Sequence, residues 1–458
     1  MIHFDRQAVN ADLHHPHGPA GLPATMERIV ADKHVAQQQV PWQELRARVH
    51  DIKAYSIANL DKLLVEFEKQ FTARGGTVLW ARDGDEGGRH FIDICVKHGV
   101  FSVVKGKSMV SEELELNERL AAGGIEPFET DLGEYIVQLA GQKPSHIIAP
   151  ALHLSRSDVG KLFAEKLGIE YTDDPEELLA AARERLRQRY LEAGLGMTGA
   201  NFGIAETGTV VVVENEGNGG LSASVPPVHV VIMGIEKVIP RLVDLPPFLH
   251  VLARAATGQK LSVYTHHFTG PEPGKAAYCI IVDNGRTKLL EDPKTREALY
   301  CIRCGACINV CPIYRRVGGW SYGWVYPGPI GSVVTPAMVG IEKAAELPFA
   351  SSLCGACQEE CPVNIDLPHQ LVHLRHKAVE AKAIGDAGER RAIDAWAKAM
   401  RSLPAYRRAT GLARFGASVL GAFGLKPGPL AAWSRRRDIP RFAKQTFKEW
   451  WLRQKRNG

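Results

Sequence analysis

The sequence lacks any long uninterrupted hydrophobic run. The longest, from Phe415 to Leu425, covers 11 residues and follows Arg414, whereas a membrane-spanning helix needs roughly 18 or more apolar residues. The N-terminus is polar and rich in histidine, without the apolar core of a secretory signal peptide. We therefore expect a cytoplasmic protein without a membrane-spanning helix, in a compartment where unpaired thiols stay reduced.

Complete nucleotide-binding motifs are also missing. Residues 194–199 match G-x-G-x-x-G, but they follow a predicted helix (residues 175–193) instead of a strand. Residues 105–108 resemble the end of a P-loop, yet Phe101 stands where the upstream glycine is required. The sequence thus shows no flavin, nicotinamide or P-loop site. Lys107 and Ser108 could still face a ligand at a strand-to-helix turn, where helix amides favour anions, and a simple helix cap and turn is the alternative interpretation.

Cysteine is the informative residue, because seven of the nine cysteines fall in two short copies of one pattern. The first copy reads Cys301-Ile-Arg-Cys304-Gly-Ala-Cys307-Ile-Asn-Val-Cys311-Pro312. The second reads Ser351-Ser-Leu-Cys354-Gly-Ala-Cys357-Gln-Glu-Glu-Cys361-Pro362, with a serine in place of the leading cysteine. The first copy is the C-x2-C-x2-C-x3-C-P run of bacterial ferredoxins. The spacing predicts two iron–sulfur clusters and an electron-transfer protein; it suits a zinc site or disulfides poorly.

The same spacing predicts which cysteines bind which cluster. In two-cluster ferredoxins the fourth cysteine of each run binds the other cluster. The first cluster is therefore assigned to Cys301, Cys304, Cys307 and Cys361. The second is assigned to Cys311, Cys354 and Cys357. Its fourth position stays open between Ser351, a water molecule, a cysteine from elsewhere and no ligand, and the last case would give a [3Fe-4S] cluster. Cys95 and Cys279 lie in apolar runs and are predicted to be core cysteines.

Alternating helical and β-rich segments predict an α/β domain ahead of the cysteine motifs. We expect an N-terminal helical extension (1–72), an α/β domain (73–290), a two-cluster iron–sulfur domain (291–385) and a basic helical C-terminal region (386–458). The predicted strands are residues 77–81, 100–105, 125–129, 146–149, 209–214, 228–233, 260–264 and 278–282. The runs at 210–213 and 228–233 are apolar without alternation, which favours strands buried on both faces of a largely parallel sheet.

Polar and small residues flank the predicted strand at 209–214. Glu206 and Thr207 immediately precede it, and a glycine-rich run, residues 215–220, follows it. Ligands of open α/β sheets bind in crevices at strand ends. The segment around Glu206 is therefore a candidate ligand-binding or relic active site, and simple loop geometry is the alternative interpretation.

The C-terminal region is strongly basic. From residue 371 to the end there are 20 Lys and Arg against 6 Asp and Glu, a net charge of +14, while the whole chain carries +5. An apolar helix face is predicted from Ile439, Phe442, Phe447, Trp450 and Trp451, and a basic face from Arg441, Lys444, Lys448, Arg453, Lys455 and Arg456. Docking on a partner subunit is the favoured interpretation, followed by peripheral contact with an anionic membrane. No nucleic-acid-binding module accompanies the charge, so no nucleic-acid partner is expected.

The chain resembles the B component of the lactate-utilisation iron–sulfur protein family across nearly its whole length. The resemblance is carried by residues 107–113 (Lys-Ser-Met-Val-Ser-Glu-Glu), residues 198–209 (Thr-Gly-Ala-Asn-Phe-Gly-Ile-Ala-Glu-Thr-Gly-Thr), the two cysteine motifs and residues 326–331 (Tyr-Pro-Gly-Pro-Ile-Gly). It implies a lactate-utilisation α/β domain, similar in fold to sugar isomerases and CoA-transferases, fused to an all-α ferredoxin-like [4Fe-4S] domain and a family-specific tail.

The resemblance also implies a function. Such a chain would be the cluster-bearing subunit of a multi-component system oxidising L-lactate to pyruvate, acting with other lactate-utilisation subunits and passing electrons to a quinone-linked or other acceptor at the cytoplasmic face of the membrane. It would be a component of a lactate dehydrogenase complex without being the catalytic centre alone. In the alternative hypothesis the α/β domain is itself an enzyme that uses Glu206, and the clusters are structural or regulatory.

Overall fold

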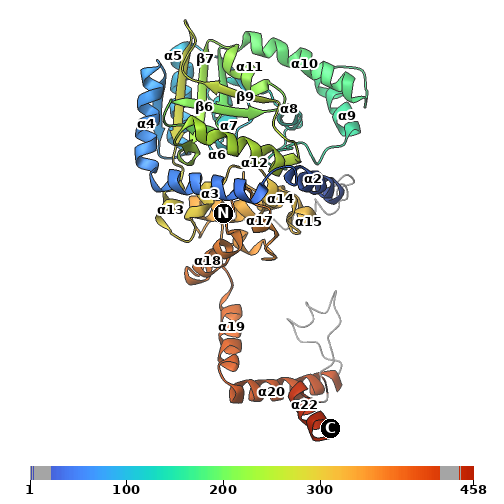
Figure 1. Cartoon of the computed structure of the whole chain (residues 1–458). Coiled ribbons are helices and arrows are strands. Elements are labelled where there is room, and N and C mark those ends of the chain that lie inside the picture. Colours follow the sequence, from blue (N-terminus) through green and yellow to red (C-terminus); the bar gives the residue numbers. More distant parts are fainter. Residues whose placement is uncertain (1, 3, 5–21, 423–442, 444, 458) are drawn as a thin grey trace. The chain divides into compact units, whose positions relative to one another are not determined.

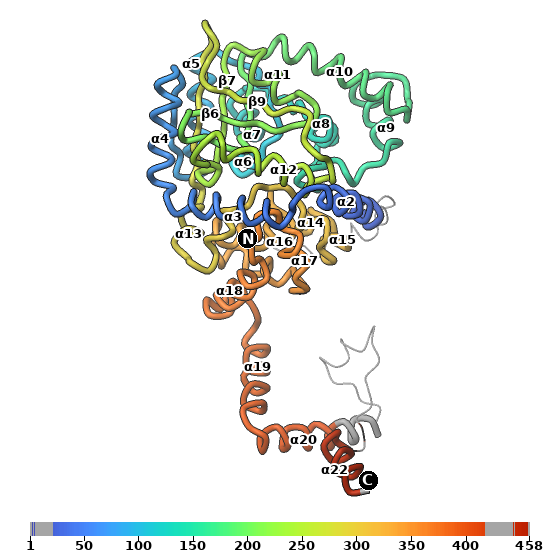
Figure 2. The backbone as a smooth tube through the Cα atoms, viewed as in Figure 1, coloured from blue at the N-terminus to red at the C-terminus, as the bar shows by residue number. Residues whose placement is uncertain are grey.

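The structure is a computed structural model that describes residues 2, 4, 22–422, 443 and 445–457 of the 458-residue chain. The chain divides into two compact units, residues 1–384 and 385–458, which are described separately (Figure 1; Figure 2). The first unit contains both the predicted α/β region and the two cysteine motifs. These two regions therefore belong to one folded body.

A six-stranded parallel sheet forms the centre of the first unit. The sequence predicts a largely parallel sheet but not its strand at residues 195–199, which contains two glycines and forms no continuous apolar run. The strand order is β1-β10-β7-β4-β2-β3, and all neighbouring pairs run parallel. The strands are β1 (Thr77–Ala81), β2 (Ser102–Lys105), β3 (Glu126–Glu129), β4 (Leu195–Gly199), β7 (Val228–Gly234) and β10 (Ala276–Val282). Every residue of β7 is buried, as expected for a central strand that is covered on both faces.

A second sheet, which the sequence did not predict, packs beside the first. Its order is β8-β5-β6-β9, built from β5 (Phe202–Ile204), β6 (Thr209–Glu214), β8 (Val238–Ile239) and β9 (Tyr264–Phe268). Strand β6 runs antiparallel to both of its neighbours, so its assignment to the parallel sheet was wrong. Its lack of alternation has another cause: Val210 and Val212 enter one hydrophobic core, whereas Val211 enters the core that holds the cysteine motifs.

Two predicted strands are corrected by local hydrogen bonding. Residues 146–149 follow a bend instead of a strand, because the His146 ring nitrogen Nδ1 accepts hydrogen bonds from the amides of Ile148 and Ala149. The strand expected at residues 260–264 starts only at Tyr264, where it pairs with Glu214 of β6. In both segments the composition favours a strand, but hydrogen bonds from the backbone to a side chain, His146 in the first and Asn215 in the second, give the chain another local conformation.

Helices surround the two sheets (Figure 1). Up to the end of β10 they are α2 (Leu22–Gln37), α3 (Trp42–Ala58), α4 (Leu60–Ala73), α5 (Gly84–His98), α6 (Met109–Glu113), α7 (Leu116–Ala122), α8 (Leu132–Leu139), α9 (Arg156–Leu167), α10 (Pro175–Glu192), α11 (Asn218–Ser224), η1 (Ile235–Lys237), η2 (Leu242–Asp244) and α12 (Leu245–Thr257). Within the helical extension predicted at residues 1–72, α3 and α4 are separate helices that meet at Asn59. The carbonyl oxygen of Ser222 lies so close to Gly196 of β4 that a Cβ on residue 196 would be 1.6 Å from it. Packing alone therefore explains why residue 196, which belongs to the G-x-G-x-x-G match, is a glycine.

The cysteine motifs lie among short helices that follow β10. These are α13 (Arg286–Glu291), η3 (Arg296–Tyr300), α14 (Ala306–Asn309), α15 (Tyr314–Val317), η4 (Trp320–Tyr322), α16 (Gly328–Val339), η5 (Leu347–Phe349), α17 (Ala356–Glu359) and α18 (Leu367–Glu380). One hydrophobic core contains Phe202 and Phe248 of the preceding region together with Cys304, Cys307 and Cys357. Burial of apolar surface therefore joins the cysteine region to the α/β region.

The second unit contains α19 (Ala387–Met400), α20 (Leu403–Ala422) and α22 (Phe447–Asn457). None of the residues of α19 is buried. On α22 the rings of Phe447, Trp450 and Trp451 lie against one another, with Phe447 stacked on Trp451, and the three side chains remain 41–74% exposed. Ile439, Arg441, Phe442 and Lys444 of the predicted helix faces lie outside the described residues. Within the described residues, no helix has the length and apolarity that crossing a membrane requires.

Candidate iron–sulfur centre

The two cysteine loops have the same backbone shape. In the first loop Arg303 (φ 60°) and Gly305 (φ 77°) are left-handed, and in the second Leu353 (φ 56°) and Gly355 (φ 88°) are left-handed at the corresponding positions. A four-residue helix follows in each loop. A left-handed conformation costs a non-glycine residue roughly 1–2 kcal/mol, so its occurrence at both Arg303 and Leu353 indicates a shared structural requirement.

Ser351 takes the place of Cys301 within this shared shape. The amide of Arg303 donates to the Cys301 sulfur over 3.4 Å. The amide of Leu353 donates to the Ser351 hydroxyl oxygen over 3.1 Å. The serine oxygen therefore lies where the leading cysteine sulfur of the other loop lies.

The four cysteines predicted for the first cluster line one small cavity. This cavity has a volume of about 20 Å³ and an almost entirely apolar lining. Its wall contains Cys301, Cys304, Cys307 and Cys361. Cys361 comes from the second loop, so the structure brings together sulfurs that lie up to 60 residues apart.

The remaining three motif cysteines are close to one another. Burial, together with the neighbouring Cys311 and Cys354 sulfurs, raises the pKa of the Cys357 thiol to about 12. Burial likewise raises the pKa of Cys304, and its neighbours Cys301 and Cys361 contribute in the same direction. Buried thiols this close together would repel one another as thiolates, and an iron–sulfur cluster supplies the positive charge that makes such a set favourable.

Backbone amides are directed at several of these sulfurs. Burial raises the pKa of Cys361 to about 11, against which the amides of Ile365 and Val363 act. The amides of Tyr314 and Ile313 act in the same way on Cys311. Hydrogen bonds to ligand sulfurs are a normal part of cluster sites, so the residues present fit this group.

No set of three or more His, Cys, Asp or Glu side chains, over the part of the chain that the structure describes, is arranged to hold one metal ion. A cubane cluster makes a different demand, since each of its thiolates binds a separate iron. Cys95 and Cys279 pack into two hydrophobic cores distinct from the one that holds the motif cysteines. Burial raises the pKa of both thiols, as expected for core cysteines.

A buried ionic network ties the first cysteine loop to the α/β region. Arg286 donates to Glu113 over 2.7 Å and to Glu236 over 2.6 Å, and Tyr326 donates to Glu113. The guanidinium of Arg303 lies 4.5 Å from the centre of the Tyr326 ring. Burial alone would raise the pKa of Glu236, but the neighbouring cations, chiefly Arg286, hold it at about 2. The network is therefore charged, and it fixes the loop relative to the sheets.

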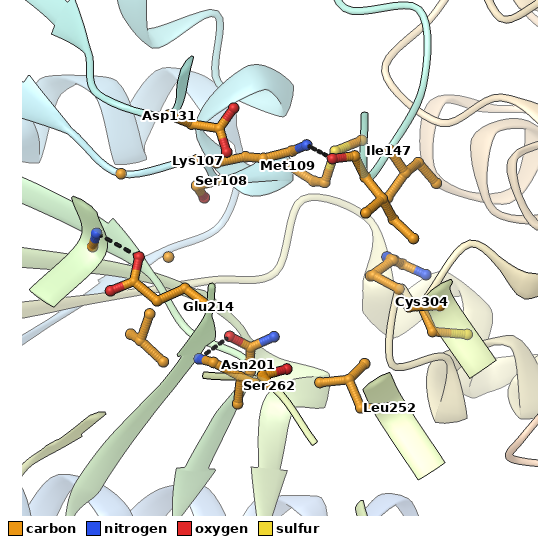
Figure 3. A pocket seen from close by; sticks show the side chains of 18 of the residues that line it. Lys107, Ser108, Met109, Asp131, Ile147, Asn201, Glu214, Leu252, Ser262 and Cys304 are labelled. Carbon is orange, nitrogen blue, oxygen red and sulfur yellow. Dashed lines mark hydrogen bonds between the residues drawn. The ribbon is translucent and has the colours of Figure 1, made fainter. Parts of the chain in front are cut away.

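A larger cavity of about 320 Å³ adjoins the first cysteine loop (Figure 3). Its lining includes Lys107, Ser108, Asp131, Asn201 and Glu214 at the ends of the strands, and Lys237, Ile302, Arg303 and Cys304 beside the cluster position. Lys107 was proposed from the sequence as a ligand contact and does line this cavity. Lys237 and Arg303 were not identified from the sequence, because Lys237 belongs to no motif and Arg303 occupies one of the two unspecified positions between Cys301 and Cys304.

Glu206 lies elsewhere. It is exposed in the turn between β5 and β6, where its carboxylate accepts a hydrogen bond from the amide of Leu242 over 3.1 Å. It does not belong to the lining of either cavity described above. The glycine-rich segment beyond β6 does contribute to the larger cavity, through Asn218 and Gly219.

Comparison with known proteins gives a consistent result. Three family descriptions match in succession: LUD domain at residues 64–288, 4Fe-4S dicluster domain at residues 297–365, and lactate utilisation protein B, C-terminal, at residues 371–456. Lactate utilization protein B of Oceanobacillus iheyensis is 42% identical over 436 residues, which cover 92% of this chain and 91% of the relative. The chain belongs to the lactate utilization protein B family.

Other members of this family are similarly close. The Bacillus thuringiensis protein of the same name is 39% identical over 428 residues, covering 91% of this chain and 90% of the relative. Among solved structures, a DUF162 family protein from Deinococcus radiodurans matches 49% of this chain and 98% of its own at 12% identity and a TM-score of 0.26. That likeness is too weak to carry an argument about the fold.

Proposed function

We propose that this chain is the iron–sulfur electron-transfer subunit of a multi-component system that oxidises L-lactate to pyruvate. The observation that carries the proposal is the small cavity lined by three cysteines of one motif and the fourth cysteine of the other. It occurs in a chain that a 4Fe-4S dicluster description matches and whose relatives are named lactate utilization protein B.

In this proposal each cluster has its own ligand set. Cys301, Cys304, Cys307 and Cys361 would hold a [4Fe-4S] cluster. Cys311, Cys354 and Cys357 would hold a second, with the Ser351 hydroxyl or water as fourth ligand, or with no fourth ligand in a [3Fe-4S] form. When bound, the clusters would supply one-electron redox centres. The amides near Cys311 and Cys361 stabilise negative charge on the sulfurs, and burial excludes water; both effects tune a reduction potential.

The chemistry assigns the first step to a partner. Conversion of L-lactate to pyruvate releases two electrons and two protons, and breaking the Cα–H bond needs a group that accepts a hydride or its equivalent. The sequence contains no recognisable flavin or nicotinamide motif. We therefore place the hydride acceptor on another lactate-utilisation subunit or on a further cofactor, and we assign the relay of single electrons to this chain.

The remaining proposals concern fold and location. We propose that the α/β region shares the sugar-isomerase and CoA-transferase fold and that the cysteine region is ferredoxin-like. The parallel sheet and the paired cysteine loops support this proposal. We also propose a cytoplasmic location, with the basic tail docked on a partner subunit and electrons delivered to a quinone-linked acceptor at the cytoplasmic face of the membrane.

Anaerobic EPR with iron and sulfide counts tests the proposal. The chain is measured alone and then with the subunits encoded beside it, before and after addition of L-lactate. We expect two clusters that L-lactate reduces only when the partner subunits are present. Reduction by L-lactate in the chain alone would place the dehydrogenase chemistry here, and absence of clusters from anaerobically reconstituted protein would overturn the proposal.

A further inference from the structure

The larger cavity shares a wall with the small cavity of the four cysteines. Ile302, Arg303 and Cys304 line both cavities. A molecule in the larger cavity would therefore be separated from the first cluster by one layer of residues. The volume, about 320 Å³, lies at the lower end of the range of small-molecule sites, roughly 300–1,000 Å³.

Two cations at this wall lack partners that would neutralise them fully. Lys237 is 8% exposed, and its ammonium forms no hydrogen bond or ion pair within 4.0 Å to any described residue. The Arg303 side chain is 10% exposed, and the carboxylate it faces, Glu236, lies 3.7 Å from it through Oε1, which is beyond hydrogen-bond reach, while Oε2 of the same carboxylate binds Arg286. Among the described residues, the Arg303 Nε and Nη1 atoms have no hydrogen-bond acceptor. Buried donors without acceptors are costly, so this end of the cavity is suited to an anion.

The Arg303 donors have two candidate acceptors, because the residue borders both cavities. Cluster sulfides are one, and a ligand in the larger cavity is the other. Lys237 separates these alternatives, since it lines only the larger cavity of the two. Its unpaired ammonium therefore points to a ligand there.

The opposite end of the cavity limits the ligand's charge. Asp131, Glu214 and Glu216 line it, and in Figure 3 Asp131 and Glu214 lie across the cavity from Cys304. These carboxylates already accept hydrogen bonds from backbone amides, as Glu214 does from Gly219 and Gly220. These three acids outnumber the cation beside them, Lys107, whose ammonium donates to the carbonyl of Ile148. A second negative charge on the ligand would therefore meet a net negative wall, whereas hydroxyl or carbonyl groups could pair with Ser108 or with the amide nitrogen of Asn201, whose oxygen is bonded to Val213.

We propose that this cavity binds a small organic monocarboxylate, with its carboxylate against Lys237 and Arg303 and its polar carbon substituent toward Ser108 and Asn201. The site would hold a 2-hydroxy or 2-oxo acid next to the first cluster. This inference goes beyond the relay role; it rests on the proposed function only for the ligand's connection to lactate oxidation, since the binding argument uses cavity geometry and charge.

Isothermal titration calorimetry on the full-length, cluster-loaded chain under anaerobic conditions tests the site. The probes are L-lactate, pyruvate and inorganic phosphate. A ligand of this size is expected to bind with a dissociation constant of about the millimolar range. Lys237→Met removes the ammonium at nearly constant length, and we expect about 10-fold or more weaker binding of the monocarboxylates. Lys69→Met, the same change on the exposed face of α4, is the matched control and should bind as the wild type does.

A second variant keeps the test independent of the folding of Lys237→Met. Ser262→Phe places a ring at a half-buried position of the cavity lining and should also block binding. Equal binding to the wild type and both cavity variants would overturn the location, and phosphate binding as tightly as pyruvate would overturn the monocarboxylate class. Absence of binding at ligand concentrations up to about 50 mM would overturn the site, but the relay function would stand if L-lactate still reduces the clusters in the presence of the partner subunits. Binding of the ligand without reduction of the clusters would support the site and overturn the relay function.

Discussion

At the scale of single residues, Ser351 is the position where the two cysteine loops differ in chemistry and agree in shape. Its hydroxyl accepts the amide of Leu353 just as the Cys301 sulfur accepts the amide of Arg303. A sulfur at this position would therefore need no rearrangement of the loop to reach the place of a leading cysteine. The serine is a weaker iron ligand than a thiolate, because iron–sulfur clusters are normally held by cysteine.

We predict that Ser351→Cys converts the second centre into an all-cysteine [4Fe-4S] cluster. Iron per chain should equal or exceed that of the wild type, any EPR signal of a [3Fe-4S] cluster should disappear, and the cluster should survive longer in air. Ser352→Cys is the control, since it adds a thiol at the adjacent, exposed residue. Identical iron content and EPR spectra in the two variants would show that position 351 does not reach the cluster.

Glu206 was a candidate because of its neighbours in the sequence, but the structure places its side chain on the surface, away from both cavities. We predict that Glu206→Gln leaves lactate-driven cluster reduction in the assembled complex unchanged, because the carboxylate lies outside both cavities and bonds only the amide of Leu242 among described residues. Stability should fall by at most about 1 kcal/mol. Loss of reduction with clusters intact in EPR would return the chemistry to this turn and favour the enzyme hypothesis.

At the scale of elements, the two cysteine loops allow one backbone requirement to be tested twice. Gly305 and Gly355 both have left-handed φ values, 77° and 88°. A Cβ on Gly305 would meet the Ile148 side chain at 2.9 Å, whereas a Cβ on Gly355 would meet nothing within 4 Å. The same substitution therefore adds a steric cost in one loop only.

We predict that Gly355→Ala costs about 1–2 kcal/mol through its φ value alone, and that Gly305→Ala costs about 1 kcal/mol more because Ile148 must move. The measurement is the urea midpoint for loss of cluster absorbance under anaerobic conditions. Equal midpoints for the two variants would mean that the Ile148 contact is not needed to hold the first loop.

The sequence predicted those features that depend on residues close together in the chain, and it missed those that depend on tertiary packing. The cysteine motifs are read within twelve residues, and strands β7 and β10 form continuous apolar runs, so these features were predictable. Strand β4 was missed, because two of its five residues are glycine and it has no such run. The second sheet was missed because β6 is buried between two cores, which produces the same run as a central parallel strand. Lys237 and Arg303 could not be found, since the cavity joins strand ends, η1 and a cysteine loop that only tertiary packing brings together.

At the scale of the whole molecule, the two units differ in how they use hydrophobic residues. The first unit has continuous cores that include the cysteines, although it also exposes single apolar side chains such as Phe101 and Val65. The second unit leaves large ones exposed, among them Trp396 at 61%, Phe415 at 72% and Phe447 at 74%. Exposed aromatic side chains on amphipathic helices with a basic opposite face are typical of surfaces that bind a partner.

We therefore predict that removal of residues 385–458 leaves cluster content unchanged and abolishes assembly with the partner subunits, because the first unit keeps its own cores and the second supplies the exposed surface. Iron and sulfide counts check the first outcome, and co-purification with the partner subunits checks the second. Trp450→Ala with Trp451→Ala in the full-length chain should weaken the same assembly, while Val65→Ala, which shortens an exposed side chain on α4, should not. Assembly retained by the truncated chain, combined with loss of binding to vesicles containing anionic lipid, would assign the tail to the membrane instead.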